Sequence, residues 1–325
     1  MTDCDVLVLG EINVDLILRA DEIAPAFGQE SLVEDATLTM GSSSVIFACG
    51  AAKLGLRVAF VGVAGDDEFG KFMRREMAAR GIDVEPVIVD RAVKTGVTVS
   101  LSTAADRALL TYPGSIAALR VGQVDHALFD RARHLHIGAY FLQTGLQEGL
   151  PHLLAQARAR GLTVSLDTGW DPSQTWNGGL SETLTQTDVF LPNAVEAAAI
   201  TGRSSAAAAL TALAQQVPVV AVKLGAEGAI ARQGKDTALR QAQDTARAEP
   251  LPVQVVDTTG VGDSFDAGFV YGFLAQWPLE RTLRLAGACG ALATREPGGV
   301  NGQPTLAEAL EAIREADQLP HPEDN

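Results

Sequence analysis

The segment that decides the fold reads Asp257-Thr258-Thr259-Gly260-Val261-Gly262-Asp263-Ser264-Phe265-Asp266-Ala267-Gly268-Phe269. A loop of small residues from Gly260 to Gly262 leads directly into an apolar stretch, which predicts a helix beginning near Asp263. The first amides of a helix have no partner within it and lie at the positive end of its dipole. Such a turn can therefore bind a phosphate or a transition-state oxyanion. Asp263 would then be a base beside the reacting phosphate, and the alternative is an ordinary helix N-cap.

On the N-terminal side of this segment, short apolar runs alternate with stretches whose apolar spacing is helical. The expected strands are residues 6–9, 58–61, 135–137, 162–166, 188–191 and 217–222. The expected helices are residues 45–54, 68–80, 145–160, 194–201 and 205–213. Strands that are apolar on both faces and alternate with helices are typical of a mostly parallel sheet flanked by helices. The sequence therefore predicts an α/β fold.

Two segments, about residues 12–40 and 85–113, interrupt this alternation. Residues 95–101 read Thr-Gly-Val-Thr-Val-Ser-Leu, and their period of two predicts a short strand. We expect both segments to form small antiparallel strands that project from the main sheet. An exposed sheet has unpaired edges, so we expect a second copy of the chain to cover it, which predicts a homodimer.

Length and composition limit the class of protein. The chain has 325 residues, of which 47% are hydrophobic, and this excludes a disordered chain. We expect residues 1–315 to form one domain, residues 232–250 to form a hairpin or surface arm, and residues 316–325 to be a flexible tail. The formal net charge of −15 disfavours a nucleic-acid partner. No uncharged apolar run is long enough to span a bilayer, so no membrane contact and a cytoplasmic location are expected.

Further small-residue motifs stand in a fixed order along the chain. They are Gly41-Ser42-Ser43-Ser44, residues 61–70, Leu191-Pro192-Asn193-Ala194-Val195-Glu196, and Val222-Lys223-Leu224-Gly225-Ala226-Glu227-Gly228. Together with residues 257–269, they resemble the ribokinase-like (PfkB) carbohydrate kinase family over roughly residues 4–315. The resemblance implies a doubly wound α/β domain with a small β-sheet lid. It also implies transfer of the γ-phosphoryl group of ATP to a hydroxyl of a sugar or sugar-like substrate.

The resemblance assigns the catalytic roles to the segment around Asp263. Asp263 is the base that takes the proton of the substrate hydroxyl, and Gly260, Val261 and Gly262 supply the amides of an anion hole. These roles agree with the chemistry, because phosphoryl transfer needs mainly positioning and charge neutralisation.

The resemblance also implies ATP and Mg²⁺ as cofactors. Asn193 and Glu196 would organise Mg²⁺ and phosphate through water, and Lys223, Gly225 and Gly228 would lie in the loop that meets the nucleotide. A monovalent cation, K⁺ in the family, would lie at Asp257 and Thr259, with residues 295–299 as the second wall of its site.

On the substrate side, Asn13, Asp15 and Gly41 match the positions that bind sugar hydroxyls in the family. Ser42 and Ser43 are also expected to bind the substrate. Together with Ile46, they stand where the family often has a second Gly, a Lys and an Asn, so the chemistry facing the substrate differs from that of a typical ribokinase. Residues 167–172 contain no Arg where members that act on acidic sugars often have one nearby, which disfavours an acidic sugar.

Three alternatives stay open. A nucleoside kinase of the same fold would need a place for the base to stack, near Phe47, Tyr112 or Tyr140. A GDSL-type hydrolase would need Ser264 exposed beside a histidine. A non-catalytic sugar-binding relative is disfavoured, because Asp263 and the glycine loop are both present.

Overall fold

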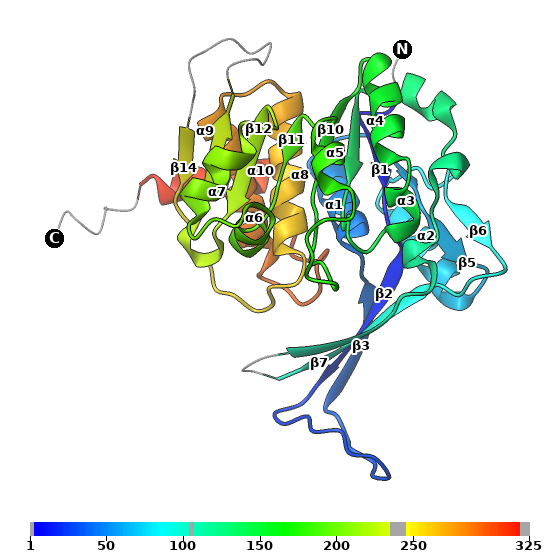
Figure 1. The fold of residues 1–325 in the computed structure, drawn as a ribbon. Helices are drawn as coiled ribbons and strands as arrows, with labels where there is room; N and C mark the ends of the chain where they lie inside the picture. Colours follow the sequence, from blue (N-terminus) through cyan, green and yellow to red (C-terminus); the bar gives the residue numbers. More distant parts are fainter. Residues whose placement is uncertain (1–2, 104–106, 235–244, 319–325) are drawn as a thin grey trace.

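A sheet of eight strands forms the centre of the molecule, and a second, smaller sheet projects from it (Figure 1). The computed structural model describes residues 3–103, 107–234 and 245–318. The strand order is β14-β13-β12-β11-β10-β9-β1-β4. The bounds are β1 (Val6–Leu9), β4 (Val58–Val61), β9 (His134–Ile137), β10 (Thr163–Leu166), β11 (Val189–Phe190), β12 (Val219–Lys223), β13 (Ala229–Gln233) and β14 (Thr245–Ala248). All neighbours from β4 to β12 pair in parallel, whereas β13 and β14 pair antiparallel.

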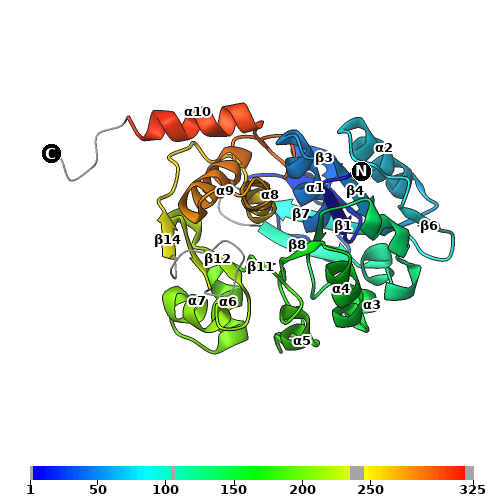
Figure 2. The same ribbon diagram turned by 90° about the horizontal axis from the view of Figure 1, so that it is seen from above.

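Helices cover both faces of this sheet (Figure 2). On one face lie α1 (Ser43–Lys53), α2 (Glu68–Ala79), α8 (Val261–Leu274), α9 (Leu279–Ala293) and α10 (Leu306–Ala316). On the other lie α3 (Thr144–Gln147), α4 (Leu150–Ala159), α5 (Leu180–Leu184), α6 (Ala194–Thr201) and α7 (Ala206–Leu213). Short 3₁₀ helices are found at Gly114–Ala117, Val121–Gln123, His126–Asp130 and Gly225–Glu227. The expected doubly wound α/β fold is therefore confirmed.

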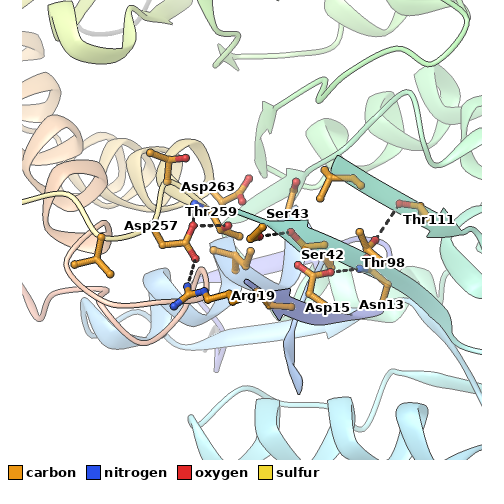
Figure 3. Close-up of a pocket in the computed structure, with 18 of the residues that line it drawn as sticks. Asn13, Asp15, Arg19, Ser42, Ser43, Thr98, Thr111, Asp257, Thr259 and Asp263 are labelled. Atoms are coloured by element: carbon orange, nitrogen blue, oxygen red, sulfur yellow. Dashed lines mark hydrogen bonds and ion pairs between the residues drawn. The ribbon is translucent and has the colours of Figure 1, made fainter. Parts of the chain in front are cut away.

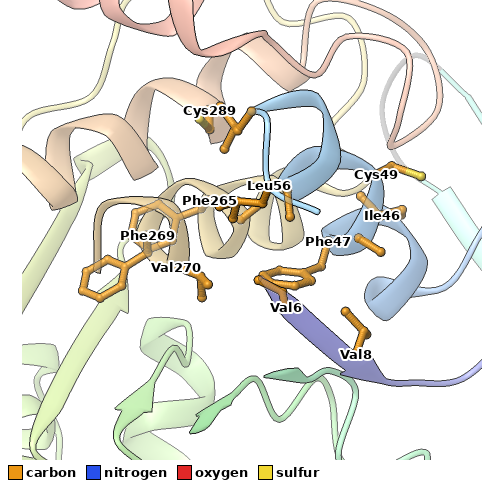
Figure 4. Close-up of a cluster of buried hydrophobic side chains, with 14 of the residues drawn as sticks. Val6, Val8, Ile46, Phe47, Cys49, Leu56, Phe265, Phe269, Val270 and Cys289 are labelled. Atoms are coloured by element: carbon orange, nitrogen blue, oxygen red, sulfur yellow. The ribbon is translucent and has the colours of Figure 1, made fainter. Parts of the chain in front are cut away.

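The alternation of side chains along β1 explains the two cores. Val6 and Val8 point to the face where Phe47 of α1 and Phe265 of α8 pack (Figure 4). Leu7 and Leu9 point to the opposite face and join the second core. Successive side chains of a strand point to opposite faces, and because β1 is covered on both sides, all four of its residues are apolar.

The projecting sheet, which we call the lid, consists of β2 (Asn13–Arg19), β3 (Asp35–Met40), β7 (Gly96–Ser102) and β8 (Arg107–Tyr112), in the order β3-β2-β7-β8. The prediction of purely antiparallel strands is wrong, because the two central strands, β2 and β7, pair in parallel. Both lead away from the main body, whereas β3 and β8 return to it. Two separate excursions of the chain therefore build one sheet.

Other boundaries also differ from the sequence-based expectation. The expected helix over residues 145–160 is interrupted between α3 and α4, where Gly149 has a φ of 83°. Helix α8 begins at Val261 rather than near Asp263. Strand β6 (Ile88–Asp90) pairs with β5 (Val63–Gly65) instead of joining the lid.

The expected arm at residues 232–250 and the expected tail fall partly on residues that the structure does not describe. The described ends of the arm belong to β13 and β14, which extend the main sheet. Residues 235–244 and 319–325 lie outside the described residues. In the part of the chain that the structure describes, no helix has both the length and the apolar character that crossing a bilayer requires.

Candidate active site

The first turn of α8 carries the glycine loop of the decisive segment. Gly260 is the N-cap residue, with a φ of 72° and no side-chain cap, so the alternative in which Asp263 caps the helix is wrong. A Cβ on Gly260 would lie 2.7 Å from the Cα of Gly299 and 2.8 Å from Cγ2 of Ile46. Both the backbone angle and the lack of space therefore require glycine there. Gly262 has no positive φ, and a Cβ on it would have its nearest contact at 3.4 Å, so it is less constrained than expected.

The loop before α8 is held by the carboxylate of Asp257. Its Oδ1 accepts hydrogen bonds from the amide (2.9 Å) and hydroxyl (2.8 Å) of Thr259, and its Oδ2 accepts one from the amide of Gly298 (2.9 Å). Arg19 of the lid places Nη2 3.9 Å from the same Oδ2. The structure therefore brings Asp257, Thr259 and the segment around Gly298 together, as the sequence analysis expected.

A cavity of about 810 Å³ separates the lid from the start of α8 (Figure 3). Its lining includes predicted residues from both sides, namely Asn13, Asp15, Ser42, Ser43, Asp257, Thr259, Gly260 and Asp263. On the lid, Nδ2 of Asn13 donates to Oδ1 of Asp15 at 3.0 Å. Gly41 lies directly behind this pair, and a Cβ on it would collide with Oδ1 of Asp15. The predicted substrate residues thus meet the predicted base in one cavity.

Ser42 and Ser43 stand where the family often has Gly and Lys, and a buried carboxylate accompanies them. Ser42 has a φ of 72°, and its Oγ lies 2.6 Å from the carbonyl oxygen and 2.8 Å from Oε1 of Glu11. Ser44 donates to the same carboxylate from its amide (3.2 Å) and its hydroxyl. Glu11 is 2% exposed, and burial raises the pKa of its carboxyl. Glu11 therefore holds the N-terminus of α1 in an unusual backbone conformation.

Asp263 is half-buried and faces both acids and a cation. Burial is the largest effect and raises the pKa of its carboxyl well above the ordinary value, and Asp167 and Glu11 raise it further. The ammonium of Lys223 and the hydroxyl of Ser43 act in the opposite direction. A carboxyl with a raised pKa has more affinity for a proton, which suits a general base.

The predicted nucleotide residues lie at the ends of β11 and β12, and none of them lines this cavity. Asn193 is the N-cap of α6, and it forms a reciprocal capping box with Glu196: Oδ1 of Asn193 accepts from the Glu196 amide (2.9 Å), and Oε2 of Glu196 accepts from the Asn193 amide (2.8 Å). Burial, together with the charge of Asp167, raises the pKa of Glu196 to about 7. The backbones of Asn193 and Lys223 form a parallel bridge.

Beyond β12, the chain turns through Gly225 and Gly228, whose φ angles are 63° and 83°. A Cβ on Gly228 would collide with the carbonyl oxygen of Ala248. Gly225 is exposed and has open space around it. The side chain of Lys223 points inward instead, where Nζ lies 2.6 Å from Oδ2 of Asp167 and 3.1 Å from both oxygens of Asp266.

Sequence reasoning missed several residues that line the cavity. Thr98 of β7 and Thr111 of β8 face it from the lid, with their hydroxyl oxygens 3.1 Å apart, and Ser100 follows Thr98 on the same face. Arg19 lines it as well. The period of two in β7 predicts that Thr98 and Ser100 share a face. The period of two does not tell which face of the lid lines the cavity.

The structure does not support two of the open alternatives. Ser264 is 1% exposed and its Oγ accepts a hydrogen bond from Gln303 (3.1 Å), so it is not an exposed hydrolase nucleophile. Phe47 is buried against the ring of His136, with 3.5 Å between ring centroids, and Tyr140 is buried too. Tyr112 is exposed on the lid but does not line the described cavity. None of these three aromatic rings offers a nucleobase a stacking surface in that cavity.

Comparison with known proteins finds a family model that matches nearly the whole chain. The family model described as pfkB family carbohydrate kinase matches residues 3–306. The chain is 30% identical over 310 residues to the ATP-dependent ribose-1-phosphate kinase of Halopiger xanaduensis, covering 95% of this chain and 97% of the relative. It is 27% identical over 326 residues to the 2-dehydro-3-deoxygluconokinase of Bacillus subtilis, covering 94% of this chain and 98% of the relative.

A solved structure shows the same fold. Ribokinase of Arabidopsis thaliana, complexed with ribose and ATP, superposes with a TM-score of 0.81 and 22% identity, over 96% of this chain and 99% of that one. The likeness extends over nearly the whole of both chains, so it includes the lid as well as the main sheet. The ribokinase-like fold that the sequence motifs implied is confirmed.

Proposed function

Because the chain belongs to the pfkB family of carbohydrate kinases, and is therefore a sugar kinase of ribokinase fold, we propose that it transfers the γ-phosphoryl group of ATP to a hydroxyl of an uncharged sugar. One observation carries the proposal. Asp263 and Gly260, the N-cap residue of α8, line the same cavity as Asn13 and Asp15 of the lid. A proton acceptor, the N-terminus of a helix and groups that bind hydroxyls thus surround one volume.

The proposed reaction uses these groups in a fixed order. Asn13 and Asp15 bind hydroxyls of the sugar, and a charged acceptor makes such hydrogen bonds stronger than neutral ones. Asp263 takes the proton of the reacting hydroxyl. The oxygen of that hydroxyl bonds to the γ-phosphorus, and the bond between the γ-phosphorus and the β-phosphate oxygen breaks, which releases ADP. The amides of Gly260, Val261 and Gly262 stabilise the negative charge of the transferring group.

Mg²⁺ fits the residues at the end of β11. Asn193 and Glu196 carry amide and carboxylate oxygens, which Mg²⁺ prefers, and because these oxygens already accept hydrogen bonds within the pair, their contact with Mg²⁺ would be through water. Burial, and after it the charge of Asp167, raises the pKa of Glu196, and a cation beside Glu196 would favour its ionised form. When bound, Mg²⁺ would neutralise charge on the phosphates of ATP.

The charge of the cavity supports an uncharged acceptor. Its lining includes one basic residue, Arg19, among the described residues. The acidic residues of the lining are Glu11, Asp15, Asp21, Glu34, Asp257 and Asp263. Like charges brought together cost several kcal/mol, on the order of 10²-fold or more in affinity, so a carboxylate or phosphate on the acceptor would be rejected. The named relatives include kinases with different acceptors, so the charge is the better guide.

K⁺ beside Asp257 and Thr259 forms a further part of the proposal. A cation there would lie next to Gly260 and stabilise the loop that carries the anion-hole amides. Hydrogen bonds from Thr259 and Gly298 already satisfy part of the Asp257 charge, and Arg19 is near it. We therefore expect K⁺ to raise turnover only modestly over a large organic cation.

We also propose that residues 1–315 act as one kinase domain that pairs with a second copy through the lid. The face of the lid opposite the cavity is apolar, because the strand register places Leu38, Leu16, Val99 and Leu110 in one row across it. Leu38 is 42% exposed and Leu110 61% exposed. Apolar sheet faces are normally covered, and a second lid offers a matching surface. Sedimentation as a monomer at micromolar concentration would contradict this part.

ADP release by the purified chain tests the main proposal. The acceptors should be neutral aldoses and ketoses, the aldonate of each active aldose, and nucleosides. We expect turnover with a neutral sugar and little with its aldonate. Preference for a nucleoside would favour the other kinase class, and turnover by an Asp263→Asn variant at the wild-type rate would exclude Asp263 as the base.

A further inference from the structure

A buried group of charges lies under the first turn of α8. Lys223 at the end of β12 reaches Asp167, which follows β10, and Asp266 of α8. The side chains of Lys223, Asp167 and Asp266 are 13%, 8% and 1% exposed. Buried charges are costly unless they are paired, so these three elements are fixed to one another at this point.

The ammonium of Lys223 is fully engaged within this group. It has three N–H donors, and it contacts three oxygen atoms: Oδ2 of Asp167 at 2.6 Å, and Oδ1 and Oδ2 of Asp266 at 3.1 Å. To bind a phosphate, Lys223 would have to give up one of these contacts and leave a buried carboxyl with less compensation. The geometry therefore argues against Lys223 as a direct nucleotide ligand.

The same side chain also lies close to the catalytic turn. A Cβ on Gly262 would lie 3.4 Å from Nζ of Lys223 and 3.9 Å from its Cδ and Cε. Asp266 follows Asp263 by three residues, so the two lie on the same side of α8. A shift of Lys223 would therefore move both an anion-hole amide and the base.

We propose that Lys223 is a positioning residue for phosphoryl transfer: anchored by Asp167 and Asp266, it fixes the turn that carries Gly262 and Asp263 and supplies positive charge beside Asp263. The proposal rests on the function proposed above. It replaces the nucleotide contact that the family resemblance implied for Lys223.

The charges around Asp263 agree with this role. Lys223 lowers the pKa of Asp263, whereas Asp167 and Glu11 raise it, and the charge of Asp263 in turn raises the pKa of Asp266. The pKa of Asp167 is lowered by Lys223 and that of Asp266 is raised by its burial. Lys223 and Asp167 therefore form the ionised pair, and loss of the Lys223 charge would leave Asp263 protonated over a wider pH range.

The experiment compares Lys223→Met and Lys223→Arg in the full chain. For each we would measure kcat, KM for ATP, KM for the sugar, and the pH profile of kcat/KM. For Lys223→Met we expect kcat to fall by about 10²-fold, the usual effect of a misplaced catalytic group, while KM for ATP stays within about threefold. The acid limb of the profile should move to higher pH. Lys223→Arg keeps the charge and should leave that limb near its wild-type position.

A double variant guards against misfolding. Lys223→Met combined with Asp167→Asn removes the ionised pair together, so no buried charge is left without a partner. It should fold, bind ATP like the wild type in calorimetry, and still have a low kcat. A higher KM for ATP with an unchanged kcat would overturn the proposal in favour of a nucleotide ligand. A lower Tm with unchanged kinetics would overturn it in favour of a purely structural role. Full activity of Asp263→Asn would refute the proposed function instead.

Discussion

The two sides of the candidate active site use their polar residues differently. On the acceptor side, Asn13, Asp15 and Ser43 line a cavity and present polar atoms to it. On the nucleotide side, Glu196 and Lys223 direct their polar atoms at other residues of the chain. Both sets stand in motifs of the same family, so a motif alone does not separate a residue that binds a ligand from one that holds the backbone. Position relative to the cavity does separate the two sets: Asn13 and Asp15 line it although they are hydrogen-bonded to each other, whereas Glu196 and Lys223 do not line it.

The largest expected effect is at the residue where the two sides meet. Asp263→Asn should lower kcat by about 10²–10⁴-fold, the usual contribution of a general base. Burial raises the pKa of Asp263, so the ionised carboxylate is disfavoured in the folded chain. The contribution of Asp263 to the free energy of unfolding therefore falls as the pH rises above the pKa of an unfolded carboxyl. At pH 7 the neutral Asn should therefore leave Tm unchanged or higher. A lower Tm with proportional loss of activity would show a structural role.

The next effect tests the loop that both sides share. Gly260→Ala forces a side chain into a position with a φ of 72° and a contact of 2.7 Å, so it should lower Tm and reduce kcat by about 10²-fold. Gly262→Ala meets its nearest atom at 3.4 Å and is the matched control, with a much smaller loss. The bulkier Gly262→Val should reduce phosphoryl transfer far more than sugar binding. Equal losses for the two alanine variants would show that the difference in space is unimportant.

A change confined to the acceptor side should affect one substrate only. Asp15→Ala removes a charged acceptor of hydroxyl hydrogen bonds, which contributes roughly 1.5–3 kcal/mol, so KM for the sugar should rise about 10- to 10²-fold. KM for ATP should stay unchanged. Steady-state kinetics with each substrate varied in turn measures both. A comparable rise in the ATP value would mean that the two sides are not separate.

The smallest effect concerns the nucleotide side. Asn193→Ala removes the N-cap of α6 and its hydrogen bonds with Glu196, and loss of such a cap costs about 1 kcal/mol. Chemical denaturation should show this loss, and KM for the sugar should not change. A stability equal to that of the wild type would indicate that Asn193 is free to bind a ligand.

Much of the fold could be predicted because the relevant signals are local. β1 and its neighbour β4 are apolar on both faces, and this pattern alone indicates a covered parallel sheet. The glycine loop before Asp263 marks a helix N-terminus, although the helix begins two residues earlier than expected. These features depend on neighbours in the sequence, which is why they could be predicted.

The remaining features depend on contacts between distant residues. Parallel and antiparallel strands have the same period of two. The sequence pattern therefore could not reveal that β2 and β7 pair in parallel, with Asn13 opposite Gly96. Lys223 stands at a strand end just before a Gly-containing turn, where a basic residue is usually exposed. Its inward direction depends on Asp167 and Asp266, which lie 56 and 43 residues away. The cavity-facing hydroxyls of Thr98 and Thr111 likewise depend on which face of the lid packs toward α8.

The attachment of the lid also limits how it can move. In the described residues the chain passes between body and lid at four places: before β2, after β3, before β7 and after β8. A lid joined to the body by one connection could rotate freely about it, whereas a lid held by four connections can only tilt about the line of those connections. Two of the four connections contain Glu11 and Ser42, which are hydrogen-bonded to each other at the cavity. Glu11 and Ser42 also line the cavity. A movement of the lid that closes the cavity would therefore also move residues of the cavity wall.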